Sequence, residues 1–408
     1  MRKHLILLYM KLNKLILAAV VLAMPVAASA QSRPAVNVPD LEFTVIKQNP
    51  ITSIKNQNRS GTCWCFSALS FLESEAIRIN GLKEADYPDF SEMFVVSHSY
   101  VDRADKYIRL DGHMGFSAGS QCEDAVHHVM KDYGLVPQSA MPGTNYGTDL
   151  PVHGEIDAVA KAYVDAINRK PNGTLSTAWK QGFQGIMDAY FGAYPEEFEV
   201  NGKKYTPITY RDSFKLVADD YVTLTSFTHH PFYTKFAVEV CDNWRNDEAY
   251  NVPIDEFMEA LYYALENGYT ATWGGDVSET GFTRNGVALL LDPKAPTTGS
   301  DQERWVGKAE EKPAEAVAGA PKELTADQAF RQKGFDEKTT TDDHGMHAFG
   351  IAKDQYGNKY LMIKNSWGVS GKYDGIWYMS DAFCRGKALD IMVHKDALPK
   401  ALRAKLGI

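Results

Sequence analysis

The sequence predicts an α+β fold built from two unlike lobes, and three observations predict it. Apolar residues recur at helical spacing early in the chain, between Cys63 and Asn80. Two strand-like stretches, at residues 346–352 and 359–364, flank a polar turn near the end of the chain. With 408 residues the chain is long enough for a two-lobed protein that carries an insertion. Helices early and a hairpin late therefore indicate a helical lobe and a β-rich lobe.

The first thirty residues are typical of a secretory signal peptide. A basic stretch comes first, followed by an apolar run over residues 15–24 that is too short to span a bilayer comfortably. Ala28-Ser29-Ala30 then forms a small-x-small cleavage signal before Gln31. We expect residues 1–30 to be removed and the protein to be exported, to the periplasm or the medium. An uncleaved anchor is the alternative, and no later stretch is apolar and long enough to be a transmembrane helix.

Charge and cysteine content narrow the class of protein further. Removal of residues 1–30, which hold four basic and no acidic residues, changes the formal net charge from −9 to −13. An acidic protein is a poor candidate for nucleic-acid binding, so no nucleic-acid partner is expected. The five cysteines are Cys63, Cys65, Cys122, Cys241 and Cys384. Because five is odd, at least one thiol is left over in an exported protein unless it pairs between chains, and catalysis is one explanation for a free thiol.

The remaining elements follow in chain order. Residues 31–55 are expected to form a strand and a turn, and a helix is expected from Cys63 to Asn80, ended by Gly81. A second helix is expected over residues 123–133, followed by an aromatic-rich insertion at roughly 138–250. A third helix is expected to begin at Pro253 and to end at Gly268, and residues 269–273 are expected to form a strand. Residues 309–321 are rich in Ala, Glu, Lys and Pro and are expected to be a flexible loop. The late hairpin turns at residues 354–358.

Cys63 is the first candidate for chemistry because it directly precedes a predicted helix. The partial positive charge of a helix N-terminus stabilises a thiolate. The small residues Ser60-Gly61-Thr62 would let a substrate backbone approach, and the Gln57 amide could donate a hydrogen bond to an oxyanion beside the Cys63 N–H. The alternative is a buried, inert cysteine beside Trp64.

The late hairpin supplies partners for that cysteine. Residues 343–347 lead into it and contain His344 and His347, and Asn365 leaves it. A hairpin brings the ends of its strands together, so Asn365 can meet a histidine from residues 343–347. The histidine would take the proton of Cys63 and the asparagine would orient its ring, which is the Cys-His-Asn variant of triad chemistry. The turn geometry alone leaves both histidines open.

These segments resemble papain-like cysteine peptidases (peptidase family C1). The run from Gln57 to Ser67 is similar to their nucleophile motif, and Lys364-Asn365-Ser366-Trp367-Gly368 is similar to their asparagine motif. The match is nearest to the bleomycin hydrolase/aminopeptidase C branch, which lacks the cysteine three residues before the nucleophile; that position is Ser60 here. Residues 119–121 and 133–137, 230–233 and 264–276 add to the resemblance, which covers most of residues 45–400. It implies a papain-like fold with a helical lobe, a β-barrel-like lobe and a large insertion.

The resemblance also assigns roles residue by residue. A glycine six residues after the catalytic histidine is common in the family, and Gly350 gives that spacing to His344, which Asp343 precedes. A metal site built on His344 and His347 is the weaker alternative, and no metal or cofactor is expected. Gln57 is implied in the oxyanion hole and Trp367 as a shield of the His–Asn hydrogen bond. The expected substrate-binding residues are Gly119, Ser120, Trp64 and Trp367, with Ser120 departing from the second of the family's paired glycines.

The implied activity is hydrolysis of peptide bonds in peptide or protein substrates through a thioester on Cys63. The branch typically carries a C-terminal arm in the cleft that restricts cleavage to free N-termini, and here the arm looks short, with residues 402–408 soon after Leu398-Pro399. An aminopeptidase is therefore the first expectation and an open endopeptidase the second. A non-catalytic peptide-binding protein and a transpeptidase are further alternatives, and a homo-oligomer is left open.

Overall fold

The computed structural model describes residues 40–283, 285–291 and 319–408. The expected signal peptide and most of the expected loop at 309–321 lie outside the described residues, as does the start of the strand-and-turn region at 31–55. The described part of the chain falls within one compact unit, Asn37–Ile408.

The helical lobe follows α2, the helix that begins at the candidate nucleophile. Its α-helices are α2 (Cys63–Asn80), α3 (Glu92–Arg109), α4 (Lys131–Tyr133), α5 (Gly154–Asn168), α6 (Trp179–Phe191) and α7 (Pro207–Ser213). Its shorter elements are the 3₁₀-helices η1 (Glu84–Asp86) and η3 (Ala218–Asp220), the π-helix η2 (Asp124–Met130) and the hairpin β2 (Phe198–Val200) and β3 (Lys203–Tyr205). The helices predicted at 63–80 and 123–133 are thus present, although most of the second is wound as a π-helix.

The β-rich lobe is one eleven-stranded sheet. Its strands are β1 (Phe43–Gln48), β4 (Tyr221–Thr225), β5 (Lys235–Ala237), β6 (Glu248–Asn251), β7 (Ala271–Gly275), β8 (Phe282–Thr283), β9 (Val287–Ala288), β10 (His344–Asp354), β11 (Lys359–Lys364), β12 (Ile376–Ser380) and β13 (Ala388–His394). The order is β5-β6-β4-β13-β7-β10-β11-β12-β9-β8, with β1 added to β10. Across the described residues the two ends of this order do not pair, so the expected β-barrel-like lobe is an open sheet.

The helices that accompany the sheet lie late in the chain. They are α8 (Ile254–Glu266), α10 (Gln328–Asp336), α11 (Asp381–Lys387), η4 (Lys395–Ala397) and α12 (Lys400–Leu406). The helix predicted from Pro253 to Gly268 is confirmed as α8, whose apolar face is buried against the sheet. The predicted hairpin is confirmed as β10 and β11, which pair antiparallel from His347 and Lys364 outward. Of the predicted insertion at 138–250, the part from β4 to β6 belongs to the main sheet.

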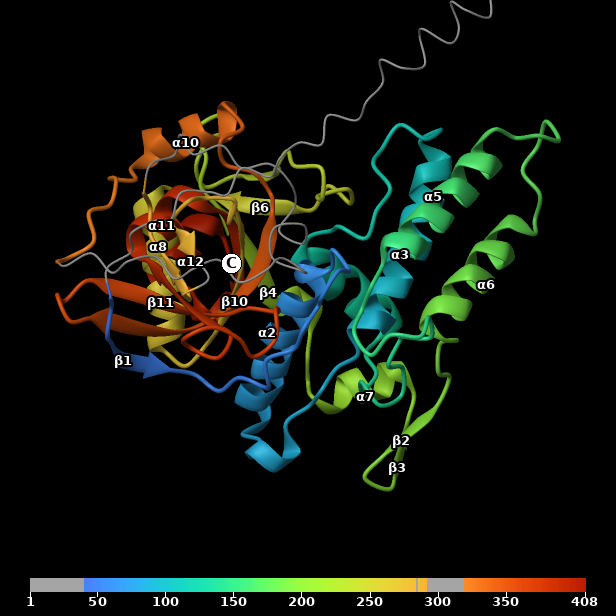
Figure 1. Ribbon diagram of the computed structural model, residues 1–408, viewed down its shortest axis with the longest axis horizontal. Coiled ribbons are helices and arrows are strands. Elements are labelled where there is room, and N and C mark those ends of the chain that lie inside the picture. The colour runs from blue at the N-terminus through green and yellow to red at the C-terminus, as the bar shows by residue number, and fades with distance from the viewer. Residues whose placement is uncertain (1–39, 284, 292–318) are drawn as a thin grey trace, which may run out of the picture. The chain divides into compact units, whose positions relative to one another are not determined.

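Helix α2 lies between the two lobes and positions the site. Figure 1 shows α3, α5 and α6 on one side of α2 and the strands of the eleven-stranded sheet on the other. Every side chain from Trp64 to Ile77 is buried, the serines and glutamates among them included, because this helix packs against both lobes. Gly81 ends the helix in the left-handed conformation, at φ 59°, which glycine adopts without strain. Cys63 is therefore held at the start of a rigid element that touches both lobes.

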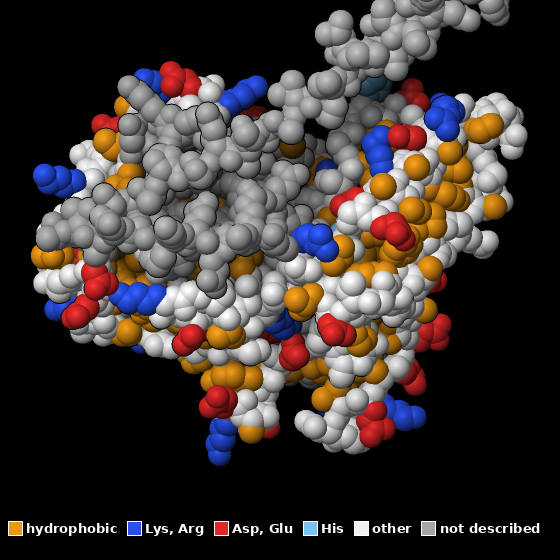
Figure 2. Space-filling view, in the orientation of Figure 1, with side chains coloured by type: hydrophobic (Ala, Val, Ile, Leu, Met, Phe, Trp, Pro, Cys, Tyr) orange, Lys and Arg blue, Asp and Glu red, His pale blue; other side chains and the backbone are white. Residues whose placement is uncertain are grey.

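Two surface features bear on the expected partners. On the face in Figure 2, acidic and basic side chains of the described residues are interspersed rather than gathered by sign. Within the described ranges, no helix combines the length and the apolar character needed to cross a membrane.

Candidate active site

Cys63 is the first residue of α2 and is partly exposed, whereas the residues that follow it are buried. The loop before it turns sharply: Asn58 and Gly61 both have positive φ, at 47° and 65°. Asparagine and glycine are the residues that tolerate this conformation best. The first N–H groups of a helix have no carbonyl partner within the helix, so this end of α2 offers donors and partial positive charge.

His344 reaches the same end of α2 because its neighbour is a glycine. A Cβ placed on Gly345 would lie 2.9 Å from Ser67 Oγ and 3.2 Å from Trp64 Cα, so a larger residue would push the strand away from the helix. Strand β10 therefore begins in direct contact with the first turn of α2. This contact brings His344, the first residue of β10, to the end of the helix where Cys63 lies.

The structure pairs Asn365 with His344 and not with His347. His344 Nε2 and Asn365 Oδ1 are 2.8 Å apart, and both residues are only 2% exposed. The same oxygen accepts a hydrogen bond of 2.7 Å from the Ser366 N–H, which fixes the orientation of the amide. His347 instead pairs through Nδ1 with Ser70 Oγ at 2.9 Å inside the protein. Burial, and then the charge of Lys364, lower the pKa of His347 well below its ordinary value.

Trp367 covers the His344–Asn365 pair. Its ring centroid lies 4.7 Å from that of His344, with the planes tilted by 32°. Trp377 and Phe282 hold the Trp367 ring edge-on at 5.5 and 6.0 Å. An apolar cover lowers the local dielectric and so strengthens the hydrogen bond beneath it.

Gln57 is tied directly to the asparagine segment. Its backbone N–H donates to Ser366 O at 2.8 Å, and the Ser366 hydroxyl donates to Gln57 Oε1 at 2.6 Å. The hydrogen bond to Oε1 fixes the orientation of the Gln57 amide. Its Nε2 group is then the end of the side chain that can donate to a ligand. Gly368 N–H also donates to Lys55 O at 3.0 Å, so the two segments are held together on both sides of Gln57. One asparagine segment thus positions both the candidate base and the candidate oxyanion donor.

Of the residues expected to bind substrate, Trp64, Gly119 and Ser120 belong to the helical lobe, whereas Trp367 belongs to the β-rich lobe. Trp64 is buried, and its indole N–H donates to Ala118 O at 2.8 Å, which ties the segment of Gly119 to α2. Trp64 therefore supports this segment from the interior. A Cβ on Gly119 would lie 2.6 Å from Asp242 Oδ2, so the close approach of that carboxylate requires glycine.

Ser120 stands where the resemblance in sequence leads one to expect a second glycine, and its side chain points inward. Its hydroxyl donates to Asp124 Oδ2 at 2.8 Å and accepts from the Trp244 indole N–H at 2.8 Å. The side chain is buried, so it takes no space on the outer side of the segment. The departure from glycine is thus accommodated by an interior hydrogen-bond network.

Two carboxyl groups beside this segment were not foreseen from the sequence. Asp342 accepts a hydrogen bond of 2.5 Å from Gln121 Nε2, which joins the two lobes. Burial, and then the nearby Asp242, raise the pKa of Asp342 well above its usual range. Asp342 precedes His344 by two residues, so its position in the sequence could have signalled it. Asp242 could not have been found, because it is distant in sequence from every motif.

The other four cysteines differ from Cys63 in their surroundings. All five thiols are free. Cys65, Cys122 and Cys384 are buried, and burial raises the pKa of each, to about 12 for Cys384. Cys241 is exposed.

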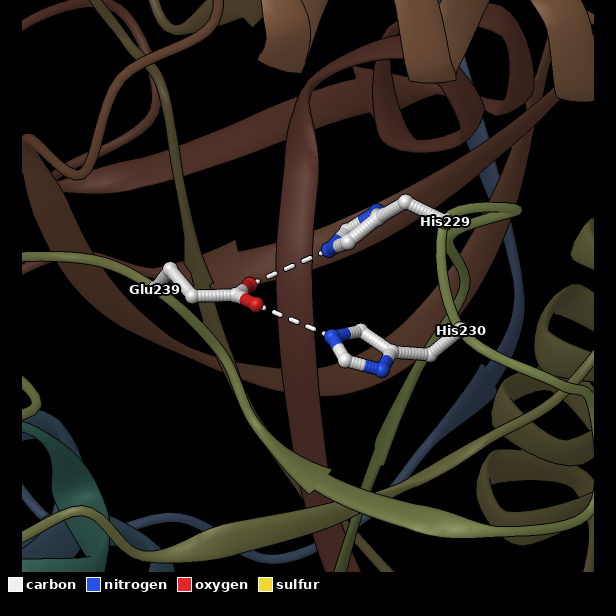
Figure 3. A group of neighbouring side chains, drawn as sticks. All are labelled: His229, His230 and Glu239. Carbon is white, nitrogen blue, oxygen red and sulfur yellow. Dashed lines mark hydrogen bonds and ion pairs between the residues drawn. The ribbon is translucent and has the colours of Figure 1, made fainter.

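One group among the described residues has the composition of a metal site. His229 Nε2 and His230 Nε2 approach opposite oxygens of Glu239, at 3.1 and 2.9 Å (Figure 3). The hydrogen bonds of Gln332 argue against metal binding by this arrangement. Gln332 Oε1 accepts from the Thr228 N–H, so Gln332 Nε2 is the group that donates to His229 Nδ1, at 3.0 Å. Neutral His229 then carries its proton on Nε2, where a metal would need a lone pair. The three side chains form a hydrogen-bonded cluster.

The last described residues pack on the β-rich lobe. Leu402 and Leu406 of α12 join its core, and Lys405 Nζ pairs with Glu256 of α8 at 2.8 Å. These side chains of α12 therefore contribute to the β-rich lobe.

Comparison with known proteins finds aminopeptidases with similar sequences and a solved structure with a similar fold. No protein-family model matches the chain. Aminopeptidase E of Lactobacillus helveticus is 22% identical over 388 residues, which cover 85% of this chain and 82% of that protein. Aminopeptidase G of Lactobacillus delbrueckii subsp. lactis is 23% identical over 409 residues, covering 86% of this chain and 83% of that protein. The crystal structure of PepW from Lactobacillus rhamnosis HN001 matches with a TM-score of 0.64 at 19% identity, over 89% of this chain and 84% of that one.

Proposed function

We propose that this chain, a homologue of aminopeptidases E and G with the papain-like cysteine peptidase fold, hydrolyses peptide bonds through a thioester formed on Cys63. The observation that carries the proposal is the arrangement at the start of α2: a partly exposed cysteine, with a buried His344–Asn365 pair beside the same helix turn. A thiol at a helix N-terminus beside an oriented imidazole is the set of groups that acyl transfer requires.

In the first half of the reaction, the Cys63 thiolate attacks the carbonyl carbon of the scissile peptide bond. The Gln57 amide and the Cys63 backbone N–H donate to the oxyanion that forms. His344, which has taken the thiol proton, gives it to the departing amine, and the C–N bond breaks to leave a thioester on Cys63. Asn365 keeps the His344 ring oriented for both transfers.

In the second half, His344 takes a proton from water, and the resulting hydroxide attacks the thioester carbonyl. The same donors hold the second oxyanion, and the C–S bond breaks to release the acid and restore the thiol. Each step uses side-chain and backbone groups of this protein together with water.

We further propose that the enzyme prefers peptides with a free N-terminus. The names of the relatives support an aminopeptidase. A free N-terminus carries an ammonium group, and it would lie near the Asp342 and Asp242 carboxyl groups beside Gly119 and Gln121. Burial raises the pKa of both carboxyl groups, and the charge of the ammonium would favour their ionised form, with which it would pair. Residues 1–30 support export, so we propose that the mature enzyme acts outside the cytoplasm; intact-mass measurement of the exported protein would locate its N-terminus.

The test follows hydrolysis of matched fluorogenic peptides with free and with acetylated N-termini, under reducing conditions. The proposal expects turnover of the free peptides, abolished in Cys63→Ala. Faster turnover of acetylated peptides would establish an endopeptidase instead. Absence of Cys63-dependent turnover over a broad peptide panel would refute the peptidase and favour a peptide-binding protein of the same fold. Sedimentation velocity on the same sample would give the oligomeric state.

A further inference from the structure

A small cavity lies behind the His344–Asn365 pair, between α2 and strands β10 and β11. The space in which the centre of a water molecule can lie has a volume of about 10 Å³, which is enough for one water molecule. The residues around it are Lys55, Phe66, Ser67, Ser70, Glu73, Glu92, Gly345, Met346, His347, Lys364, Asn365 and Ser366. The cavity is therefore both polar and of the right size to hold one water molecule.

Two residues of the cavity wall each carry a buried side-chain nitrogen that has no hydrogen-bond partner among the described residues: Asn365 Nδ2 and His347 Nε2. Asn365 is 2% exposed and His347 is fully buried, so bulk water reaches neither side chain freely. Asn365 Oδ1 is committed to His344 and to the Ser366 N–H, which leaves Nδ2 as the end of the amide that faces away from them. Buried polar atoms are almost always paired, and ordered water pairs those that protein atoms do not reach.

His347 is suited to hold such a water. Its Nδ1 is paired with Ser70 Oγ at 2.9 Å, so the ring is fixed from α2 with Nε2 at its other side. Burial, and then the charge of Lys364, lower the pKa of His347 well below its ordinary value, which favours the neutral ring. A neutral imidazole presents either an N–H or a lone pair at Nε2. A water molecule complements both, because it donates as well as accepts.

The charged groups around the cavity already have partners. Lys364 Nζ donates to Thr52 Oγ1 at 3.0 Å, and burial lowers its pKa to about 8. Lys55 Nζ pairs with Glu92 Oε1 at 2.6 Å and lies 3.6 Å from Glu73. Because the Glu73 and Glu92 carboxylates face Lys55, they do not serve as hydrogen-bond acceptors for Asn365 Nδ2.

We propose that the cavity binds one ordered water molecule that bridges Asn365 Nδ2 to His347 Nε2, and that His347 is thereby a positioning residue for Asn365. The chain of contacts runs from Ser70 on α2 through His347 and the water to Asn365, and from Asn365 Oδ1 to His344. It links the helix that carries Cys63 to the amide that orients the base. The effect of His347 on kcat rests on the proposed function. The presence of the bound water is independent of that function.

The kinetic test compares His347→Met, which removes both ring nitrogens at similar volume, with His347→Gln, which restores a polar end. Loss of one hydrogen bond to Asn365 should lower kcat about 5-fold in His347→Met with KM changed less than about twofold. His347→Gln should recover most of kcat. His98→Met is the matched control, because His98 is a buried histidine of α3 stacked between Tyr133 and Tyr194. It should lower the melting temperature without lowering kcat of the folded enzyme.

The structural test is a crystal structure of Cys63→Ala at a resolution that shows ordered water. A density peak within about 3.2 Å of both Asn365 Nδ2 and His347 Nε2 is expected, and it should be missing in His347→Met. An empty cavity, or wild-type kcat in His347→Met, would overturn the inference. If the wild-type protein shows no Cys63-dependent turnover, the proposed function fails, and the density alone still decides whether the water is there.

Discussion

Replacing Asn365 with alanine removes the acceptor that orients His344 and leaves the rest of the site in place. The hydrogen bond lost is 2.8 Å long, buried, and covered by Trp367. When His344 is protonated during catalysis, this bond is charge-assisted, and such bonds contribute about 1.5–3 kcal/mol. At 1.36 kcal/mol per factor of ten, kcat/KM should fall about 10- to 150-fold. The loss should appear in kcat, because Asn365 acts through His344 rather than on the substrate.

The assay measures kcat and KM on a fluorogenic peptide with a free N-terminus, together with thermal unfolding of each variant. Asn49→Ala provides the control. Asn49 is also a buried asparagine of the β-rich lobe, and its amide donates to Leu265 O and Tyr269 O at 2.9 and 2.7 Å. Both variants should lose stability, but only Asn365→Ala should lose kcat.

Equal kinetic loss in the two variants would mean that Asn365 matters only through folding. Unchanged kcat in Asn365→Ala would refute the positioning of His344 altogether. A complete loss of turnover, as large as that of Cys63→Ala, would indicate that Asn365 does more than orient a ring.

Three further predictions follow from single contacts. Gln57→Ala removes an oxyanion donor and should lower kcat about 100- to 1,000-fold with little change in KM, measured by steady-state kinetics; an effect confined to KM would contradict this role. Trp367→Leu opens the cover of the His344 ring to water, and kcat/KM should fall about tenfold, with the greatest loss expected on the least reactive amide substrates. Burial, and then Asp390, raise the pKa of Glu123 to about 8, so the folded protein binds this proton more tightly than the unfolded chain and loses stability as pH rises from about 4.5 to 8. Glu123→Gln should therefore raise the melting temperature by about 3 °C at pH 8 and leave it unchanged near pH 4.5; a gain that is the same at both values would show that the carboxylate charge is not the cause.

The sequence was sufficient to predict the elements that carry the chemistry. The helix from Cys63 to Asn80 and the hairpin of β10 and β11 have strong local patterns, and both are present with nearly the predicted bounds. The pairing of a histidine with Asn365 follows from the same hairpin. The choice between His344 and His347 required the family spacing, because His347 pairs with Lys364 in the strand register and so lies nearer to Asn365 along the ladder.

What could not be predicted depends on contacts between distant segments. Asp242 lies against Gly119 through packing that no local pattern encodes. The inward turn of Ser120 depends on Trp244. The extent of the open sheet depends on β4 pairing with β13 and β6 pairing with β4, whereas the sequence predicts only an unplaced insertion at residues 138–250. The π-helical winding of residues 124–130 also has no signal in the sequence, since its side chains suit an α-helix equally well.

The central claim is that His344 activates Cys63, and thiol alkylation tests it without a substrate. The measurement follows iodoacetamide modification of the wild-type protein and of His344→Ala at pH 6, with peptide mapping by mass spectrometry. Cys241, which is exposed, serves as an internal reference. If His344 activates Cys63, Cys63 should react at least about tenfold faster than Cys241 in the wild type, and this advantage should be lost in His344→Ala. Equal rates at the two thiols, or an advantage of Cys63 that survives in His344→Ala, would contradict it.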